Sequence, residues 1–246
     1  MSKFTLPNGV SLNGKLYNII ELDEIRGKHQ NRLVNPNPKT PIDFIEPILT
    51  DLILDLHNVE SESIFPQVSR KDLVLNKLPI QDIQFILIKV RELSYDSTYL
   101  MKLKCTHCEA DNNAKLDLST LTISARVDKL TEEQMILPKG KLPFRYGHMG
   151  LGHLVKMVLQ DNKTEITDKM MTTLSSFMLA SLGENTSVKP ADLDDLKASD
   201  LDFIRDNAPE LPEPDMVVEH TCSSCSKDFK QELPVLSADF LLHMRT

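Results

Sequence analysis

All four cysteines of the 246-residue chain fall into two pairs with the same spacing, Cys105-Thr-His-Cys108 and Cys222-Ser-Ser-Cys225. Two cysteines three positions apart on a tight turn can direct both sulfur atoms at one ion, so each pair supplies half of a tetrahedral four-thiolate shell. A complete shell needs both pairs at one point in space, and this constrains how everything between them folds. The spacing therefore predicts a zinc site with the ligands Cys105, Cys108, Cys222 and Cys225.

The segments on either side of each cysteine pair predict β-hairpins. Apolar and polar residues alternate before and after both pairs, as expected for half-buried strands. The alternating segments are residues 99–104 and 114–118 around the first pair, and residues 216–221 and 229–233 around the second. Two such hairpins clasped on one ion would form a zinc ribbon. A shell of four cysteines leaves no open position for water, so the zinc is expected to be structural and not catalytic.

Other uses of the cysteines are less consistent with the sequence. Disulfides need an oxidising compartment, and the N-terminus has no apolar core of a signal peptide. A thioredoxin-type pair lies at a helix start, which neither pair does. An iron–sulfur cluster stays open as an alternative, although its usual bacterial spacings differ. His107 and His220 could each replace a thiolate, but we interpret both as exposed turn residues.

The rest of the sequence is interpreted as mainly helical. Residues 109–221 separate the two cysteine pairs, far more than a bare ribbon needs. We therefore predict an α+β fold, mainly helical, with a split zinc ribbon (two CxxC β-hairpins) closed around a long helical insertion. The predicted domains are an N-terminal arm and helical region (1–94), a zinc-ribbon-like module (95–122 and 216–246) and an inserted helical domain (123–215).

Apolar spacing locates the individual elements. A strand is predicted over residues 15–20, and a helix from Pro79 to about Leu93, with the proline suited to its first turn. A three-four-three-four spacing of apolar residues predicts one helix over residues 42–57, formed by Ile42, Ile45, Leu49, Leu52 and Leu56. A shorter helix is expected over residues 152–160.

Composition and motifs exclude several classes of function. The formal net charge of −8 argues against broad electrostatic binding to nucleic acid or anionic membrane, and no apolar run approaches the roughly 20 residues that span a bilayer. We therefore expect a soluble, intracellular protein. His148 and His153 are five positions apart, not four, so the metalloprotease helix pattern is missing, as are the Gly-x-Ser-x-Gly elbow and the phosphate-binding loop. The sequence thus predicts no enzyme, no catalytic residues and no small-molecule substrate.

The order of features resembles one family. A Leu-Pro-x-Gly arm (Leu6, Pro7 and Gly9) precedes a strand, a polar helix and two apolar helices, and a CxxC knuckle is followed by an alternating acidic strand around Asp117. This order is similar to that of the baseplate hub and hub-assembly proteins of T-even-like contractile-tailed bacteriophages.

The resemblance implies a non-enzymatic role in building or forming the tip of the phage tail. The four cysteines would carry over as metal-binding residues. The implied partners are other phage tail and baseplate proteins, with self-association as a further expectation. The implied locations are the host cytoplasm during assembly and the tail baseplate of the virion.

Two alternatives stay open. The first is an assembly chaperone that never enters the particle. The second is a zinc-ribbon adaptor for nucleic acid or transcription, which is less consistent with the negative net charge and with Phe229 as the only aromatic residue close to the second cysteine pair.

Overall fold

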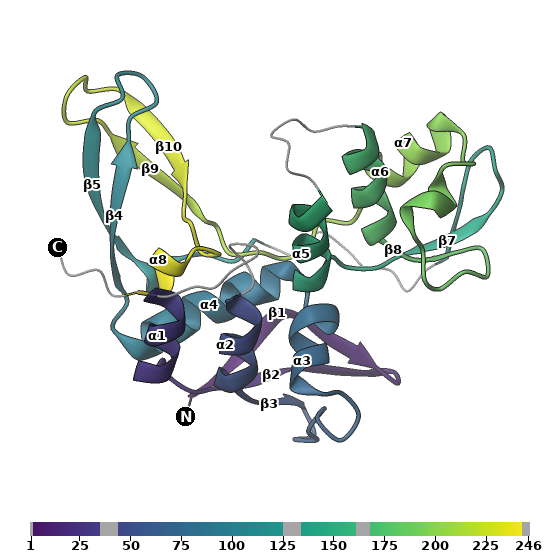
Figure 1. The fold of residues 1–246 in the computed structure, drawn as a ribbon, viewed down its shortest axis with the longest axis horizontal. Helices are drawn as coiled ribbons and strands as arrows, with labels where there is room; N and C mark the ends of the chain where they lie inside the picture. Colours follow the sequence, from purple (N-terminus) through teal and green to yellow (C-terminus); the bar gives the residue numbers. More distant parts are fainter. Residues whose placement is uncertain (1, 35–43, 125–133, 161–167, 243–246) are drawn as a thin grey trace.

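The computed structural model describes residues 2–34, 44–124, 134–160 and 168–242 (Figure 1). Its N-terminal part contains a three-stranded antiparallel sheet in the order β1 (Ser2–Leu12), β2 (Lys15–Leu22), β3 (Ile53–Asn58). Asn13 and Gly14 connect β1 to β2, and both have a positive φ, as a two-residue hairpin turn requires. The predicted strand over residues 15–20 is confirmed.

Helices cover this sheet. They are α1 (Gly27–Val34), α2 (Ile45–Leu52), the single turn α3 (Arg70–Asp72) with the π-helical turn η1 (Leu73–Lys77), and α4 (Ile80–Ser94). The long helix α4 confirms the prediction over residues 79–93. It packs against β1 and buries Ile83, Ile86 and Val90 completely.

The single helix predicted over residues 42–57 is wrong in its second half. Residues 42 and 43 lie outside the described residues, and α2 ends at Leu52. From Ile53 the chain is extended as β3 and pairs with β2, so that Leu56 faces Ile20 across the ladder. The apolar residues of this stretch satisfy a helical and a strand pattern equally, and pairing with β2 selects the strand.

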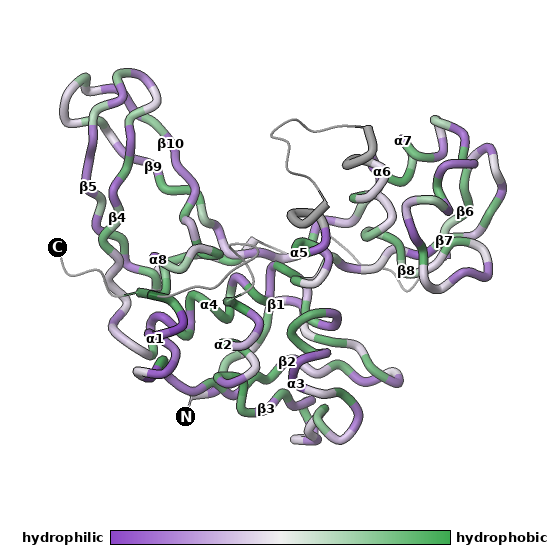
Figure 2. The backbone as a smooth tube through the Cα atoms, in the orientation of Figure 1, coloured by the Kyte–Doolittle hydropathy of each residue, from purple (hydrophilic) through white to green (hydrophobic). Residues whose placement is uncertain are grey.

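Two β-hairpins carry the cysteines. The first consists of β4 (Thr98–Lys104) and β5 (Asp111–Asp117), followed by the 3-10 turn η2 (Leu118–Thr120). The second consists of β9 (Val217–Thr221) and β10 (Asp228–Glu232), and the short helix α8 (Ala238–Leu241) follows it. Figure 1 shows the hairpins side by side, projecting away from the helices. In Figure 2 hydrophobic residues recur between hydrophilic ones along these strands, which fits their alternating burial.

The region between the hairpins is not the helical insertion that the sequence predicts. It contains helices α5 (Leu151–Gln160), α6 (Asp168–Phe177) and α7 (Ala198–Asp206) and the 3-10 turn η3 (Pro190–Leu193). It also contains a second three-stranded antiparallel sheet, β6 (Met135–Ile136), β7 (Pro143–Tyr146) and β8 (Leu179–Leu182). Four small antiparallel sheets occur among the described residues, so the prediction of a mainly helical α+β fold is wrong.

The buried apolar residues form two clusters. The larger one joins the N-terminal sheet, its helices, the inner faces of both hairpins and Leu151 of α5. The smaller one lies within the inserted region and consists of Leu137, Phe144, Tyr146, Leu179, Leu182, Leu193 and Ile204. The predicted domain boundaries stay a prediction. Within the described ranges, no helix combines the length and the apolar character needed to cross a bilayer.

Candidate metal centre

The first cysteine pair lies on the turn that joins β4 to β5. The N–H of Cys105 donates to the carbonyl of Ala110 at 3.0 Å, and the N–H of Glu109 donates back to the carbonyl of Cys105 at 2.9 Å. These two bonds close a loop around Cys108. Glu109 has a φ of 59°, a left-handed conformation that lets the chain turn back sharply into β5.

The second pair repeats the same backbone between β9 and β10. The N–H of Cys222 donates to the carbonyl of Lys227, and the N–H of Ser226 donates to the carbonyl of Cys222, both at 2.9 Å. Ser226, which follows Cys225 directly, has a φ of 57°. The chain therefore builds two equivalent turns, each of which presents two sulfur atoms.

The structure brings all four predicted cysteines together. The Sγ atoms of Cys105 and Cys225 lie 3.8 Å apart, and those of Cys108 and Cys222 lie 3.6 Å apart. All four ligand atoms lie within 4.8 Å of one another, and all four cysteines are free of disulfides. A tetrahedron with metal–sulfur bonds of about 2.3 Å has sulfur–sulfur edges of about 3.8 Å. The cluster thus has the dimensions to hold one metal ion.

Backbone N–H groups point at two of the sulfur atoms. The N–H of His107 donates to the Sγ of Cys105, and the N–H of Ser224 donates to the Sγ of Cys222, both at 3.4 Å. The two bonds occupy the same place in the two turns. Hydrogen bonds of this kind stabilise the thiolate form, which is the form that binds a metal.

One family model matches most of the chain. The family described as T4 bacteriophage base plate protein matches residues 55–240, from β3 to α8, including the four cysteines. The chain belongs to this family. No curated protein and no solved structure matches it. The protein is therefore a phage baseplate component, and its family points to other phage tail proteins as partners and to the virion tail as its location. The Leu6–Gly9 arm lies outside the matched residues.

Asn112 of this baseplate protein lies beside the cysteine cluster, a position that was not predicted from the sequence. It is only 5% exposed, and its side-chain oxygen accepts a hydrogen bond from the N–H of Ser223 at 2.9 Å. Its amide nitrogen donates to the carbonyl of Ala110 at 2.9 Å and lies 3.6 Å from the Sγ of Cys222. In the sequence, Asn112 is a polar residue at an inward-facing position of the alternating strand β5, and a buried polar residue of this kind needs hydrogen-bond partners.

The charges of the thiols depend on one another. The N–H of Cys225, together with the Asn112 amide, lowers the pKa of Cys222 to about 6 against the opposing effect of burial. The N–H of Ala110 lowers the pKa of Cys108, but the neighbouring thiols and burial raise it more, to about 12. Four thiolates this close repel one another. All four thiols can therefore be ionised together only when a cation lies between them.

The two histidines near the cysteines are not part of the cluster. His107 is exposed, as predicted, and its Nε2 lies 3.1 Å from the carbonyl oxygen of Asp228. His220 is half-buried on β9, where its ring meets Phe229 edge-on with centroids 5.7 Å apart. The prediction that His220 is an exposed turn residue is therefore wrong. Of the histidines, cysteines and carboxylates that the structure describes, only the four cysteines form a potential metal-binding group.

Proposed function

We propose that this baseplate protein is a non-enzymatic structural or assembly component of the baseplate hub, stabilised by one structural zinc ion. The ligands would be Cys105, Cys108, Cys222 and Cys225. The observation that carries the metal proposal is the gathering of four sulfur atoms, within 4.8 Å of one another, from two hairpins far apart in the sequence. An ion there would fasten the second hairpin, near residue 222, to the first hairpin, near residue 105.

The geometry favours one ion over an iron–sulfur cluster. A cluster of two or four irons would hold the cysteine sulfurs apart by its own width. Here two sulfur pairs, at 3.8 Å and 3.6 Å, already match the edges of a shell around one ion. Zinc is the usual occupant of a closed four-thiolate tetrahedron.

A closed shell also supports a structural role. Catalytic zinc sites keep one position for water or substrate, and four thiolates leave none. The ion would instead contribute to folding, since its binding free energy is available only when both hairpins are in place. Such an ion would stabilise one conformation of the protein while other subunits assemble around it.

The metal is tested by elemental analysis of the purified protein. We expect one zinc per chain in the native protein and none in Cys108→Ser, with Ser224→Ala as a matched control that keeps all four thiols. Stoichiometric iron, or zinc retained in Cys108→Ser, would contradict the proposal.

The hub role is tested by quantitative mass spectrometry of purified particles, combined with chemical cross-linking. We expect a few copies per particle, cross-linked to proteins at the centre of the baseplate. Cross-links confined to peripheral baseplate proteins would contradict a hub position. A chain found in infected-cell lysate but absent from particles would be a transient assembly factor, which is the second form of the proposal.

A further inference from the structure

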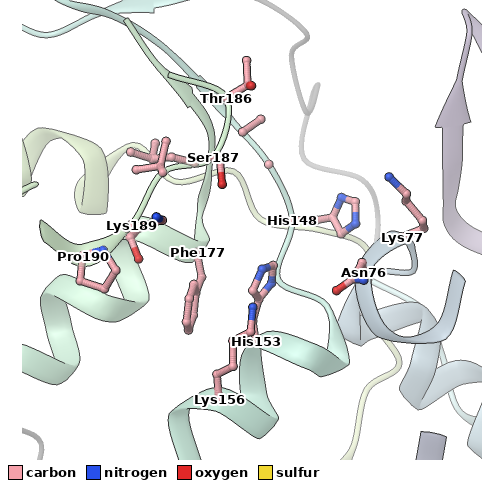
Figure 3. A pocket seen from close by; sticks show the side chains of 15 residues that line it. Asn76, Lys77, His148, His153, Lys156, Phe177, Thr186, Ser187, Lys189 and Pro190 are labelled. Atoms are coloured by element: carbon pink, nitrogen blue, oxygen red, sulfur yellow. The ribbon is translucent and has the colours of Figure 1, made fainter. Parts of the chain in front are cut away.

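A pocket of about 610 Å³ lies between the π-helical turn η1 of the N-terminal part and the region between the two hairpins. One side is formed by η1 and α5, which pack on the larger cluster, and the other by β8 and residues 186–190 beside the smaller cluster. Figure 3 shows Asn76, Lys77 and His148 on one wall, Lys189 and Pro190 on the opposite wall, and His153 between them. Pockets at such junctions are common ligand sites.

The pocket is basic in a protein that is acidic. Its lining includes Lys77, Lys156 and Lys189, and none of these lysines takes part in an ion pair with the described residues. The described lining contains no aspartate and no glutamate. The whole chain nevertheless has a net charge of −8. Three lysines line the pocket and no carboxylate occurs among its described lining residues, and this balance of charge attracts an anion.

His153 adds a neutral hydrogen-bond donor to the three charges. Its Nδ1 accepts a hydrogen bond from the N–H of Gly150 at 3.1 Å, so the proton of the neutral ring is on Nε2. Burial lowers the pKa of His153, which keeps the ring neutral near pH 7. The ring stacks on Phe177, with centroids 4.6 Å apart and planes 23° apart, so it is held in one orientation.

We propose that this pocket binds a carboxylate carried by an acidic segment of a neighbouring protein in the baseplate. Lysine ammonium groups and the Nε2–H of His153 would pair with the carboxylate oxygens. The pocket contains no arginine among its described residues, and arginine is the side chain best suited to the phosphate of a free anion or of a nucleic acid. The inference depends on the chain being a baseplate protein and is independent of the zinc and of the hub position.

The test uses the full-length protein and two blocked hexapeptides, one of alternating Asp and Glu and one of alternating Asn and Gln. Isothermal titration should detect the acidic peptide and not the neutral one. The double variant Lys156→Glu, Lys189→Glu should weaken binding at least about tenfold, because attraction becomes repulsion. The matched control Lys102→Glu, Lys115→Glu makes the same change of charge on the outer face of the first hairpin and should leave affinity unchanged.

A second measurement keeps the test valid if the double variant folds poorly. In the unmodified protein the acidic peptide should shift the ring resonances of His153 and leave those of the exposed His107 in place. Equal binding to both double variants, a shift at His107 alone, or no binding of the acidic peptide would overturn the proposal. Tighter binding of inorganic phosphate or of a single-stranded oligonucleotide, with the same dependence on Lys156 and Lys189, would overturn it in favour of that ligand. None of these outcomes changes the zinc content or the particle composition, so this proposal can fail while the proposed function stands.

Discussion

The side chain of Asn112 accepts a hydrogen bond from the backbone N–H of Ser223, and the two residues are 111 positions apart in the sequence. This bond joins the two cysteine-bearing hairpins directly, beside the sulfur cluster. Further bonds connect the same hairpins, from the N–H of Lys104 to the side-chain oxygen of Gln231 at 3.2 Å and between His107 and the carbonyl of Asp228. The hairpins therefore have a polar interface of their own in addition to the four thiols.

Asn112→Ala should weaken both the fold and the metal site. The substitution leaves the N–H of Ser223 without its partner and removes one of the two donors to the carbonyl of Ala110, at a cost of about 1 kcal/mol in the free energy of unfolding. Loss of an outer-shell contact to Cys222 should also lower metal affinity about 10- to 100-fold. Urea denaturation and competition with a chromogenic chelator measure the two effects. The exposed neighbour Asn113→Ala is the control, and equal behaviour of the two variants would contradict the assigned role.

Cys222→Ser should release the metal and separate the two hairpins. The N-terminal sheet and its helices should persist, because most of their buried contacts are with each other. Elemental analysis gives the metal content, and circular dichroism with amide hydrogen exchange shows which segments lose protection. Ser223→Ala keeps the thiols intact and serves for comparison. A Cys222→Ser variant with full metal content and a normal melting curve would show that the four cysteines do not share an ion.

Asp82 should make stability depend on pH between about 4 and 7. Its carboxylate accepts from the N–H and the side-chain amide of Asn8, both at 3.0 Å, and from the N–H of Gly9 at 2.7 Å. Burial nevertheless raises its pKa from 3.8 to about 6, which corresponds to about 3 kcal/mol.

Because the folded pKa is the higher one, this contribution to stability is complete below about pH 4 and is lost as the pH rises through about 6. The free energy of unfolding of the native protein should therefore fall relative to that of Asp82→Asn over this range. Urea titrations at successive pH values measure the difference, with the exposed Asp195→Asn as the control. A difference that is constant, or that grows with pH, would refute the prediction.

Arg91→Met should detach the C-terminal helix α8. The guanidinium of Arg91 donates to the carbonyl of Phe240 at 2.5 Å and to that of Leu242 at 3.1 Å, and it lies 4.6 Å from the ring centre of Tyr99. Removing a buried charged donor from two carbonyls should cost about 3 kcal/mol. Urea denaturation measures this loss, and limited proteolysis should cut first near residue 238. The exposed Lys71→Met should change neither result, and a stable, uncut Arg91→Met would disprove the role.

The cysteine cluster could be predicted from sequence because metal coordination requires particular residue types at a particular spacing. Four thiols in two matching spacings identify their own ligand set, and the flanking alternation identifies the strands that hold it. The helix α4 was equally predictable, since its apolar face recurs over four turns and Pro79 marks its start.

The remaining errors come from short elements and from tertiary contacts. Leu179 and Leu182 are three positions apart, a spacing that suits a helix, yet they lie in the four-residue strand β8 because β7 pairs with it. Ile53 continues an apolar helical pattern but begins β3. Asn112 and Asp82 look like ordinary polar residues until the fold surrounds them with donors and acceptors from distant segments. Period and spacing carry no information about such partners.

Because the two cysteine pairs are far apart in the sequence, the ribosome synthesises them at different times. A ribosome releases Cys105 and Cys108 first, and the residues between Cys108 and Cys222 must be added before the second pair exists. At typical translation speeds that interval is roughly 6 to 20 seconds. During this interval the first pair offers only half a shell, while the strands β6, β7 and β8 of the second sheet are synthesised. Closing the sulfur cluster therefore has to wait until the whole region between the two hairpins has been synthesised.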